Sequence, residues 1–374
     1  MTFSIITPSF KQLDWLRLCV ASVRDQINIA SNEMRKAECE MRNAISVVSD
    51  FAQRERSGFP TTIANSTSDF QMSCFKLDTL TVEHIIQDAG SPGIEDFARE
   101  VKADFYRDGA LVFASPLSSG DSREAHVSTH QPSTLDSRPY RIAIHCESDC
   151  GMYDAINRGL VKATGEIVAH LNSDEQYLPA AFKSIAGIFS AESNLDLLYA
   201  SAVILRRDGE YICQRDPVIP NATHVCISHL HTLTASTFFR RETITQKGLY
   251  FSTEFLALGD AEWALRALQS GLQIKAVPFL SSAFFEAESN LGISQESMAE
   301  RERLRETVPR WKRTVWPLWI IHHLARRLLA GHYSRDPFEY AVYTPRFGIS
   351  ARKSFRVKRP SAIYPKYLKI IIGK

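Results

Sequence analysis

Three polar loops, each directly after a predicted strand, carry the side chains best suited to bind a ligand. They begin at Pro8, Asp88 and Asn172, and the third reads Asn-Ser-Asp-Glu. Carboxylate and amide oxygens at such positions can accept hydrogen bonds or bind a hard cation. A further acidic residue, Asp260, opens a predicted helix at residues 261–270, and a helix N-terminus favours the ionised form of a carboxylate.

The elements that must position these loops alternate between strand and helix. Short β-rich runs occupy residues 3–7, 82–87, 141–145 and 166–171, and apolar residues recur at helical spacing over 13–26 and 152–164. This alternation predicts an α/β fold with a mostly parallel central sheet and helices on both faces. Because ligands bind beyond the carboxyl ends of such strands, we expect the three loops to converge at one edge of the sheet.

Two stretches interrupt the alternation. Residues 27–80 are predicted to be a helical and loop insertion, in which apolar residues from Ala30 to Phe51 recur at alternating spacings of four and three. The seam at 30–51 fits either a helix packed on its own body or self-association with a second subunit. Residues 115–138 are rich in Ser, Pro and His, which is typical of a mobile loop.

The charge is distributed unevenly along the chain. The 374 residues hold 44 basic and 42 acidic side chains, a net charge of +2, but residues 301–374 alone carry +14. The acidic body and its basic tail have an ordinary hydrophobic content, which excludes a disordered or collagen-like chain. Residues 1–10 lack the features of a secretory signal, the seven cysteines form no CxxC pair, and no apolar run is long enough to span a membrane. We therefore expect a cytoplasmic protein.

Four blocks of the sequence resemble, in order, those of family 2 glycosyltransferases. The blocks are TPSFKQLDWLRLCVASVRDQ, VEHIIQDAGS, SDCGMYDAINRGLVKATGEIVAHLNSDEQYLP and LGDAEWALRALQSG. The resemblance covers roughly residues 1–290 and implies the GT-A fold, a nucleotide-binding α/β sandwich. It also implies inverting transfer of a sugar from a nucleoside diphosphate donor, expected to be UDP-linked. The acceptor would be a hydroxyl of a saccharide or lipid-linked molecule, as in cell-surface polysaccharide or glycolipid biosynthesis.

The resemblance assigns a metal site to the loop at residues 172–175. Asn172-Ser173-Asp174 stands where the family has its DxD motif, so Asp174 would bind a divalent cation, Mn²⁺ or Mg²⁺, with Glu175 as a helper. Such a cation neutralises the diphosphate leaving group as the glycosidic bond breaks. Asn172 replaces the first acidic residue of the motif and is expected to bind the donor, since it can accept a hydrogen bond. It brings no charge, which leaves open a polar turn without a metal.

The donor nucleotide would be bound by the first two loops. Thr7, Pro8 and Phe10 match the family's first nucleotide-contacting segment, and Asp88 stands where an acidic residue holds the base. A carboxylate can accept a hydrogen bond from uracil N3–H. The alternative for Asp88 is an Asx turn that stabilises Gly90 and the residue after it.

The block from 147 to 159 would complete the donor pocket. Asp149 and Asn157 are expected to line it, with Tyr153 and Asp154 supporting the junction between loop and helix. The alternative for Asp149 is a cap on the following helix.

The general base would come from the fourth block. Asp260 matches the family's catalytic carboxylate, which takes the proton from the attacking acceptor hydroxyl, and Glu262 is the reserve candidate. Gly259 stands where the family has a Glu. The alternative for Asp260 is a plain helix N-cap.

His229 and His231 are separated by one residue, so on a strand they would point to the same face. By the resemblance, His231 would contact the acceptor or the diphosphate. A metal-binding pair and satisfied structural histidines are the alternatives.

Residues 291–374 are predicted to form a basic helical C-terminal extension beyond a catalytic domain at 1–290. Basic residues and aromatic ones such as Trp316 and Trp319 suit the surface of an anionic membrane, which would place the protein on the inner membrane face. A helix packed on the catalytic domain with a charged solvent face is the alternative. No nucleic-acid partner is expected, because the acidic body would oppose it.

The sequence therefore predicts a metal-dependent glycosyltransferase. The rival hypothesis is a catalytically degenerate relative that serves as a nucleotide-sugar or glycan-binding scaffold. Asn172 and Gly259, which depart from the family pattern, are the residues that favour the rival.

Overall fold

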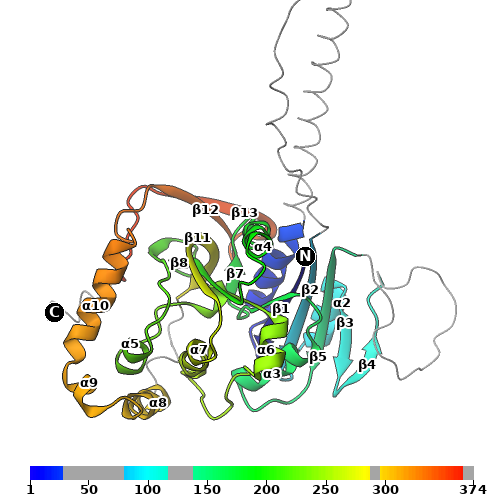
Figure 1. The fold of residues 1–374 in the computed structure, drawn as a ribbon. Coiled ribbons are helices and arrows are strands. Elements are labelled where there is room, and N and C mark those ends of the chain that lie inside the picture. Colours follow the sequence, from blue (N-terminus) through cyan, green and yellow to red (C-terminus); the bar gives the residue numbers. More distant parts are fainter. Residues whose placement is uncertain (28–79, 117–137, 287–294, 365–374) are drawn as a thin grey trace, which may run out of the picture.

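The computed structural model describes residues 1–27, 80–116, 138–286 and 295–364 (Figure 1). Within these residues an 11-stranded sheet has the order β4-β3-β5-β2-β1-β6-β10-β8-β11-β7, with β9 paired to β8. The strands are β1 (Thr2–Ser9), β2 (Thr81–Asp88), β3 (Asp104–Arg107), β4 (Ala110–Phe113), β5 (Tyr140–Cys146), β6 (Ile167–His170), β7 (Glu175–Tyr177), β8 (Leu197–Leu205), β9 (Tyr211–Arg215), β10 (Thr237–Arg240) and β11 (Ile274–Phe285).

Helices connect and cover these strands. The first spans residues 13–27. The others in the body are α2 (Ile94–Val101), α3 (Met152–Lys162), α4 (Ala181–Ala191), α5 (Ala222–Ile227), the 3-10 helix η1 (Thr234–Ser236), α6 (Arg241–Lys247) and α7 (Gly259–Gln269).

The prediction of an α/β fold with a mostly parallel sheet is confirmed at the centre of the molecule. Strands β3, β5, β2, β1 and β6 are neighbours and all run parallel. Antiparallel pairs occur outside this group, where β10 lies between β6 and β8, β7 pairs with β11, and β4 and β9 cover edges. The parallel group places the ends of β2, β1 and β6 side by side.

Helices bury both faces of the sheet, as expected. On one face Phe3 and Ile5 of β1 pack with the helix at 13–27 and with Phe182 of α4. On the other, Ile6 packs with apolar residues of α3 and with Trp263 of α7. Successive side chains of β1 point to opposite faces of the sheet, so Phe3 and Ile5 pack against one layer of helices and Ile6 packs against the other.

The C-terminal region differs from the prediction of a helical extension. Helices α8 (Gln295–Glu306), α9 (Arg310–Thr314) and α10 (Trp316–Leu329) are present, but a β-hairpin follows, β12 (Phe338–Thr344) and β13 (Gly348–Val357). In Figure 1 the hairpin runs from α10 across to the side where β7 and α4 lie. Tyr340, Val342 and Val357 share an apolar cluster with residues of β8 and β11, so the hairpin completes the core of the body.

Two predictions fall largely or wholly outside the described residues. They are the helical and loop insertion at 27–80, with the self-association seam at 30–51, and the mobile loop at 115–138. Among the described residues, no helix combines the length and the hydropathy that crossing a membrane requires.

Candidate active site

The predicted convergence of the three polar loops is confirmed. Ser9, at the end of β1, pairs with Asp88, at the end of β2. The backbone N–H of Lys11 donates to Ser91 Oγ at 2.7 Å, and Ser173 Oγ donates to Gln12 Oε1 at 3.0 Å. The loop after β1 is thus hydrogen-bonded to the loops after β2 and β6.

Thr7 and Phe10, the first and last residues of the segment expected to contact the nucleotide, lie in different environments. Thr7 is fully buried, and its Oγ1 lies 2.9 Å from His84 Nε2, so its hydroxyl faces the strand β2. Phe10 is 52% exposed, and the ammonium of Lys11 lies 4.6 Å from the centre of its ring. Pro8 is half-buried between them. Phe10 is therefore the residue of this segment with an apolar surface free for a ligand.

Asp88 forms the Asx turn that was one of its two interpretations. Its Oδ1 accepts hydrogen bonds from the N–H groups of Gly90 and Ser91, at 3.0 and 2.6 Å, and its Oδ2 accepts from Ser91 Oγ. The side chain is buried, and these bonds hold the loop in shape. Because both oxygens of the Asp88 carboxylate already accept hydrogen bonds within the loop, the loop offers a ligand its backbone rather than a free carboxylate.

The loop after β6 gathers two carboxyl groups and an amide. Asn172 N–H donates to Glu175 Oε2 at 2.8 Å, while Asn172 Oδ1 is buried without a hydrogen-bond partner. Burial raises the pKa of Asp174, and burial together with the Asp174 charge raises the pKa of Glu175 to about 8. The charge of Arg207 lowers the pKa of Asp174, but burial outweighs it. Oxygen ligands of this kind fit Mg²⁺ or Mn²⁺.

Within this loop the carboxyl groups differ in accessibility. Glu175 is 2% exposed and closes the turn, whereas Asp174 is half-buried. Asp174 is therefore the more accessible of the two carboxyl groups, and Glu175 supports the loop.

Asp149 and Asn157 both have hydrogen-bond partners within the protein. Asp149 Oδ1 accepts from the N–H of Gly151, the residue that caps α3, at 2.9 Å. Asn157 binds the backbone of Phe251 twice, once as donor and once as acceptor, at 2.8 Å each. Asn157 therefore ties α3 to the segment that precedes α7, a structural task that the sequence did not reveal.

A narrow pocket brings the candidate base next to the end of β6. Asp260 and His170 line it together with Tyr199, Leu230, Thr232, Thr234, Thr237, Phe239, Phe251, Trp263 and Ala264. Its cavity volume is about 10 Å³, roughly the space of one water molecule. Three of the lining residues have buried polar atoms without a hydrogen-bond partner, namely His170 Nδ1, Tyr199 Oη and Thr232 Oγ1.

Asp260 lies in the first turn of α7, one residue beyond its start. The helix begins at Gly259 with Leu258 as its N-cap, so the interpretation of Asp260 as a plain N-cap is wrong. Tyr153 Oη accepts a hydrogen bond from the Asp260 N–H at 3.2 Å, and Asp260 Oδ1 accepts from Ala261 N–H at 2.8 Å. Burial raises the pKa of Asp260 to about 6, which suits a general base that works near neutral pH.

Glu262, the reserve candidate, is held by an ion pair. Arg266, one helical turn later, donates to both of its carboxylate oxygens, at 2.6 and 2.9 Å. Glu262 is not among the residues that line the pocket. Asp260 is thus the carboxylate of α7 that faces it.

Glu300 is a residue of the site that the sequence did not reveal. Its carboxylate, from α8, accepts hydrogen bonds from the N–H groups of Leu256, Ala257 and Leu258, at 2.6, 3.1 and 2.8 Å. These three residues lead directly into α7. Glu300 therefore fixes the approach to Asp260 from outside the region that resembles the family.

Gly259 is required by packing. A Cβ atom at this position would lie 2.6 Å from Cε2 of Tyr153, whose hydroxyl binds the Asp260 N–H. A Glu at residue 259 would displace that ring. The close packing of the Tyr153 ring thus explains why this chain has glycine where the family has a Glu.

His231 does not line the pocket itself, although its two neighbours Leu230 and Thr232 do, and it lies in a group of histidines. It is 8% exposed and sits with His229 in an irregular segment between α5 and η1, so the premise of a strand is wrong. His231 Nε2 has no hydrogen-bond partner, so the interpretation as a satisfied structural histidine is wrong as well.

No protein-family model matches the chain, and no curated protein matches it. Solved structures similar to it include TarS from S. aureus, at 14% identity and a TM-score of 0.46, covering 88% of this chain and 44% of TarS. TarS 1–349 in complex with UDP-GlcNAc has 13% identity and a TM-score of 0.48, covering 88% of this chain and 75% of the other. The mannosyltransferase PcManGT from Pyrobaculum calidifontis, in complex with GDP-Man and Mn²⁺, has 12% identity and a TM-score of 0.41, covering 89% and 81%. The chain spans less than half the length of the full TarS structure.

Proposed function

We propose that this protein is an inverting glycosyltransferase that uses a nucleoside diphosphate sugar, expected to be UDP-linked. One observation carries the proposal. The three strand-end loops meet at one edge of the parallel sheet, and the pocket that holds Asp260 opens beside β6, the strand that leads into Asp174. A cation site and a general base in neighbouring positions are what direct displacement at an anomeric carbon requires.

Each part of the site would have a distinct task. The exposed ring of Phe10 and the backbone of the Asp88 turn would bind the nucleotide base. The unpartnered polar atoms of His170, Tyr199 and Thr232 line a space for one water-sized group, so they would bind a single hydroxyl group next to Asp260. Asp260 would take the proton from the acceptor hydroxyl as that oxygen attacks.

Asp174 and Asn172 Oδ1 would hold the divalent cation, Mn²⁺ or Mg²⁺. When bound, the cation neutralises the phosphates of the leaving group. The raised pKa of Asp174, caused by burial, fits a site that a cation completes.

Donor binding tests the proposal first. Thermal unfolding is measured with a panel of nucleotides and nucleotide sugars, with and without Mn²⁺. We expect a nucleoside diphosphate to raise the melting temperature only with the cation, and Asp174→Asn to remove that shift. No stabilisation by any nucleotide would contradict the proposal.

Turnover separates the enzyme from the scaffold hypothesis. Donor hydrolysis and transfer are measured for the wild type, for Asp260→Asn, and for Glu262→Gln as a control on the same helical turn. We expect Asp260→Asn to lower kcat by about 10²–10⁴-fold with donor binding intact, and Glu262→Gln to act like the wild type. Binding without turnover in the wild type would favour the scaffold. Retention of anomeric configuration in the product would contradict inversion.

We further propose that α10 rests on an anionic membrane surface. Its apolar residues Leu318, Ile321, Leu324, Leu328 and Leu329 are exposed, on the side opposite the buried His323 and Arg327. A surface hollow next to α9 is lined by Arg305, Arg310 and Arg313, with Glu302 and Thr314. An apolar helix face beside basic residues suits an anionic lipid surface.

A further inference from the structure

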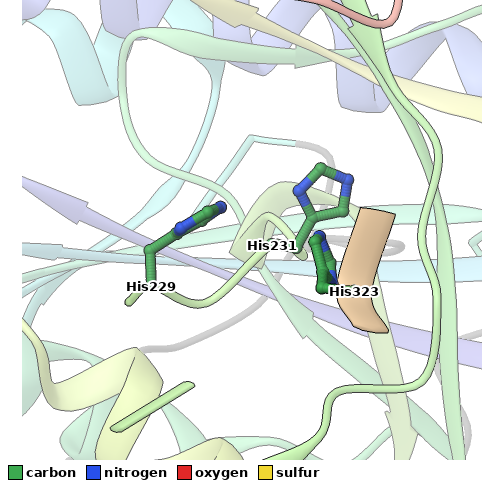
Figure 2. A group of neighbouring side chains, drawn as sticks. All are labelled: His229, His231 and His323. Atoms are coloured by element: carbon green, nitrogen blue, oxygen red, sulfur yellow. The ribbon is translucent and has the colours of Figure 1, made fainter. Parts of the chain in front are cut away.

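Three histidines from two distant parts of the chain meet beside the candidate active site. His229 and His231 come from the irregular segment between α5 and η1, and His323 comes from α10 (Figure 2). One side-chain nitrogen of each lies within 4.8 Å of the others. Nitrogen atoms bound to one tetrahedral Zn²⁺ lie roughly 3.4 Å apart, so modest rotation of the rings would bring all three onto one ion.

Two of these side chains are buried with polar atoms that lack partners. His231 is 8% exposed and His323 is 6% exposed, and the Nε2 atom of each has no hydrogen bond. An unpartnered nitrogen in the interior costs free energy that a metal–ligand bond would recover. For His229, Ser228 Oγ lies 2.9 Å from Nδ1, an outer contact of the kind that orients metal-bound histidines.

The surroundings keep these imidazoles neutral, the form that binds metals. Burial lowers the pKa of His229 and of His323 to about 3, and lowers that of His231. The charges of Arg215 and Arg327 contribute in the same direction. Because the histidines are unprotonated at neutral pH, binding a metal does not first require the loss of a proton.

We propose that His229, His231 and His323 form a transition-metal site for Zn²⁺, separate from the Asp174 cation site. Neutral imidazole nitrogens favour Zn²⁺ over Mg²⁺ or Mn²⁺, which prefer oxygen ligands. Three protein ligands leave the fourth tetrahedral position for water. The ion would fasten α10 to the body of the protein. The proposal does not depend on the glycosyltransferase proposal.

The site would also fix one wall of the Asp260 pocket. Leu230 and Thr232, which alternate with the two loop histidines, line that pocket. A metal bound to His229 and His231 would hold the intervening segment in one conformation, and with it the two pocket residues.

Metal binding is tested on the full chain after chelation of adventitious ions. The wild type is titrated with Co²⁺, whose visible absorption reports tetrahedral nitrogen ligation, and bound Zn²⁺ is counted by elemental analysis after dialysis. His323→Ala is compared with His322→Ala, which removes an exposed histidine next to it on α10. We expect His323→Ala to weaken Zn²⁺ binding by more than the roughly 10–100-fold loss typical of an outer-shell partner, and His322→Ala to bind as the wild type does.

A second variant tests whether the ion is bound by both α10 and the segment between α5 and η1. His229→Asn, which removes a ligand from the other element, should lose the Co²⁺ spectrum even if His323→Ala does not fold. Hydrogen exchange of α10 should slow when Zn²⁺ is added to the wild type. A wild type without tetrahedral Co²⁺ absorption, or unchanged affinity in both His323→Ala and His229→Asn, would overturn the proposal.

Discussion

The environment of Asp260 depends on two side chains that never face the pocket. Tyr153 accepts the hydrogen bond of its N–H, and Glu300 binds the three backbone N–H groups that lead into its helix. Burial raises the pKa of Asp260 and the backbone hydrogen bonds lower it, while the charge of Glu300 adds to the rise and the charge of Arg301 opposes it. The position of Asp260 and its affinity for a proton are therefore set by the same neighbours.

This coupling predicts a shift in pH dependence. A base with a pKa of about 6 is protonated and inactive below that pH, so kcat/KM should fall as the pH drops through about 6. Glu300→Gln removes the negative charge, lowers the pKa of Asp260 and should move this limb to lower pH. Glu302→Gln, an exposed change on the same helix, is the control. A limb that stays in place in Glu300→Gln would show that the profile reports another group.

A second residue-scale prediction concerns Gly259. Gly259→Ala places a methyl group 2.6 Å from the Tyr153 ring, which must then move. We expect a loss of about 1–3 kcal/mol in the free energy of unfolding and a lower kcat, measured by denaturant unfolding and by steady-state kinetics. Gly187→Ala, at a helical glycine with open space around it, should leave kcat unchanged and should not lower the free energy of unfolding, because alanine is the better helix former.

Part of the site could be predicted at the scale of single residues. Asp174 and Asp260 stand at the ends of elements, where the sequence pattern itself marks a functional position. Glu300 lies in α8, whose run of charges is typical of a solvent-exposed helix, so nothing in the pattern distinguishes it. Thr7 and Asn157 match the family blocks, but a match in position does not say which way a side chain points.

At the scale of elements, α10 has two faces with separate contacts. His323 and Arg327 are buried, and Arg327 Nη2 donates to the carbonyl of Ala362 at 2.8 Å. The structure buries His323 and exposes Leu324 and Leu328 of the same helix. The helix therefore packs on the body, as one of its two interpretations expected, but much of its solvent side is apolar rather than charged.

The exposed face gives a prediction about lipid binding. Ile321→Glu with Leu328→Glu should reduce co-sedimentation with anionic vesicles, because each change removes apolar contact and adds a repelling charge. Nucleotide binding should be unchanged. Leu111→Glu, on β4 at the other end of the molecule, is the matched control, since Leu111 is also an exposed leucine. Equal sedimentation of the double variant and the wild type would contradict the membrane proposal.

Some strands could be predicted from the sequence, whereas others could not. Strands β1, β2, β5 and β6 are short apolar runs that end in turn-forming residues, a pattern that sequence reveals. The hairpin of β12 and β13 was missed because much of β13 is exposed and its basic residues resemble those of a charged helix. Its packing partners lie on β8 and β11, far away in the sequence.

At the scale of the whole molecule, the hairpin connects the C-terminal region with the helix at residues 13–27. Arg352 of β13 is hydrogen-bonded to the carboxylate of Asp25, at 3.0 Å, and to the carbonyls of Tyr177, Ala341 and Ser22. Tyr343 of β12 donates to the same carboxylate. The predicted domain boundary at residue 290 therefore marks where the family resemblance ends. The hairpin, which follows this boundary, packs on residues that precede it.

These contacts predict that Arg352 contributes strongly to stability. Its side chain is 8% exposed, and Arg352→Met leaves the Asp25 carboxylate with the Tyr343 hydroxyl as a donor but without its positive partner, which should cost about 3 kcal/mol in the free energy of unfolding. Arg356→Met on the same strand is the control, because that side chain is 72% exposed and its ion pair with Glu339 should contribute less than about 1 kcal/mol. Equal melting temperatures for the two variants would contradict the prediction.

The position of the hairpin also matters while the chain is being synthesised. Until residue 357 has left the ribosome, the apolar face formed by β8 and β11 has no cover from Tyr340, Val342 and Val357. Transiently exposed apolar surface of this kind promotes aggregation. The nascent protein should therefore rely on chaperones late in translation, and messages truncated before the hairpin should give insoluble products.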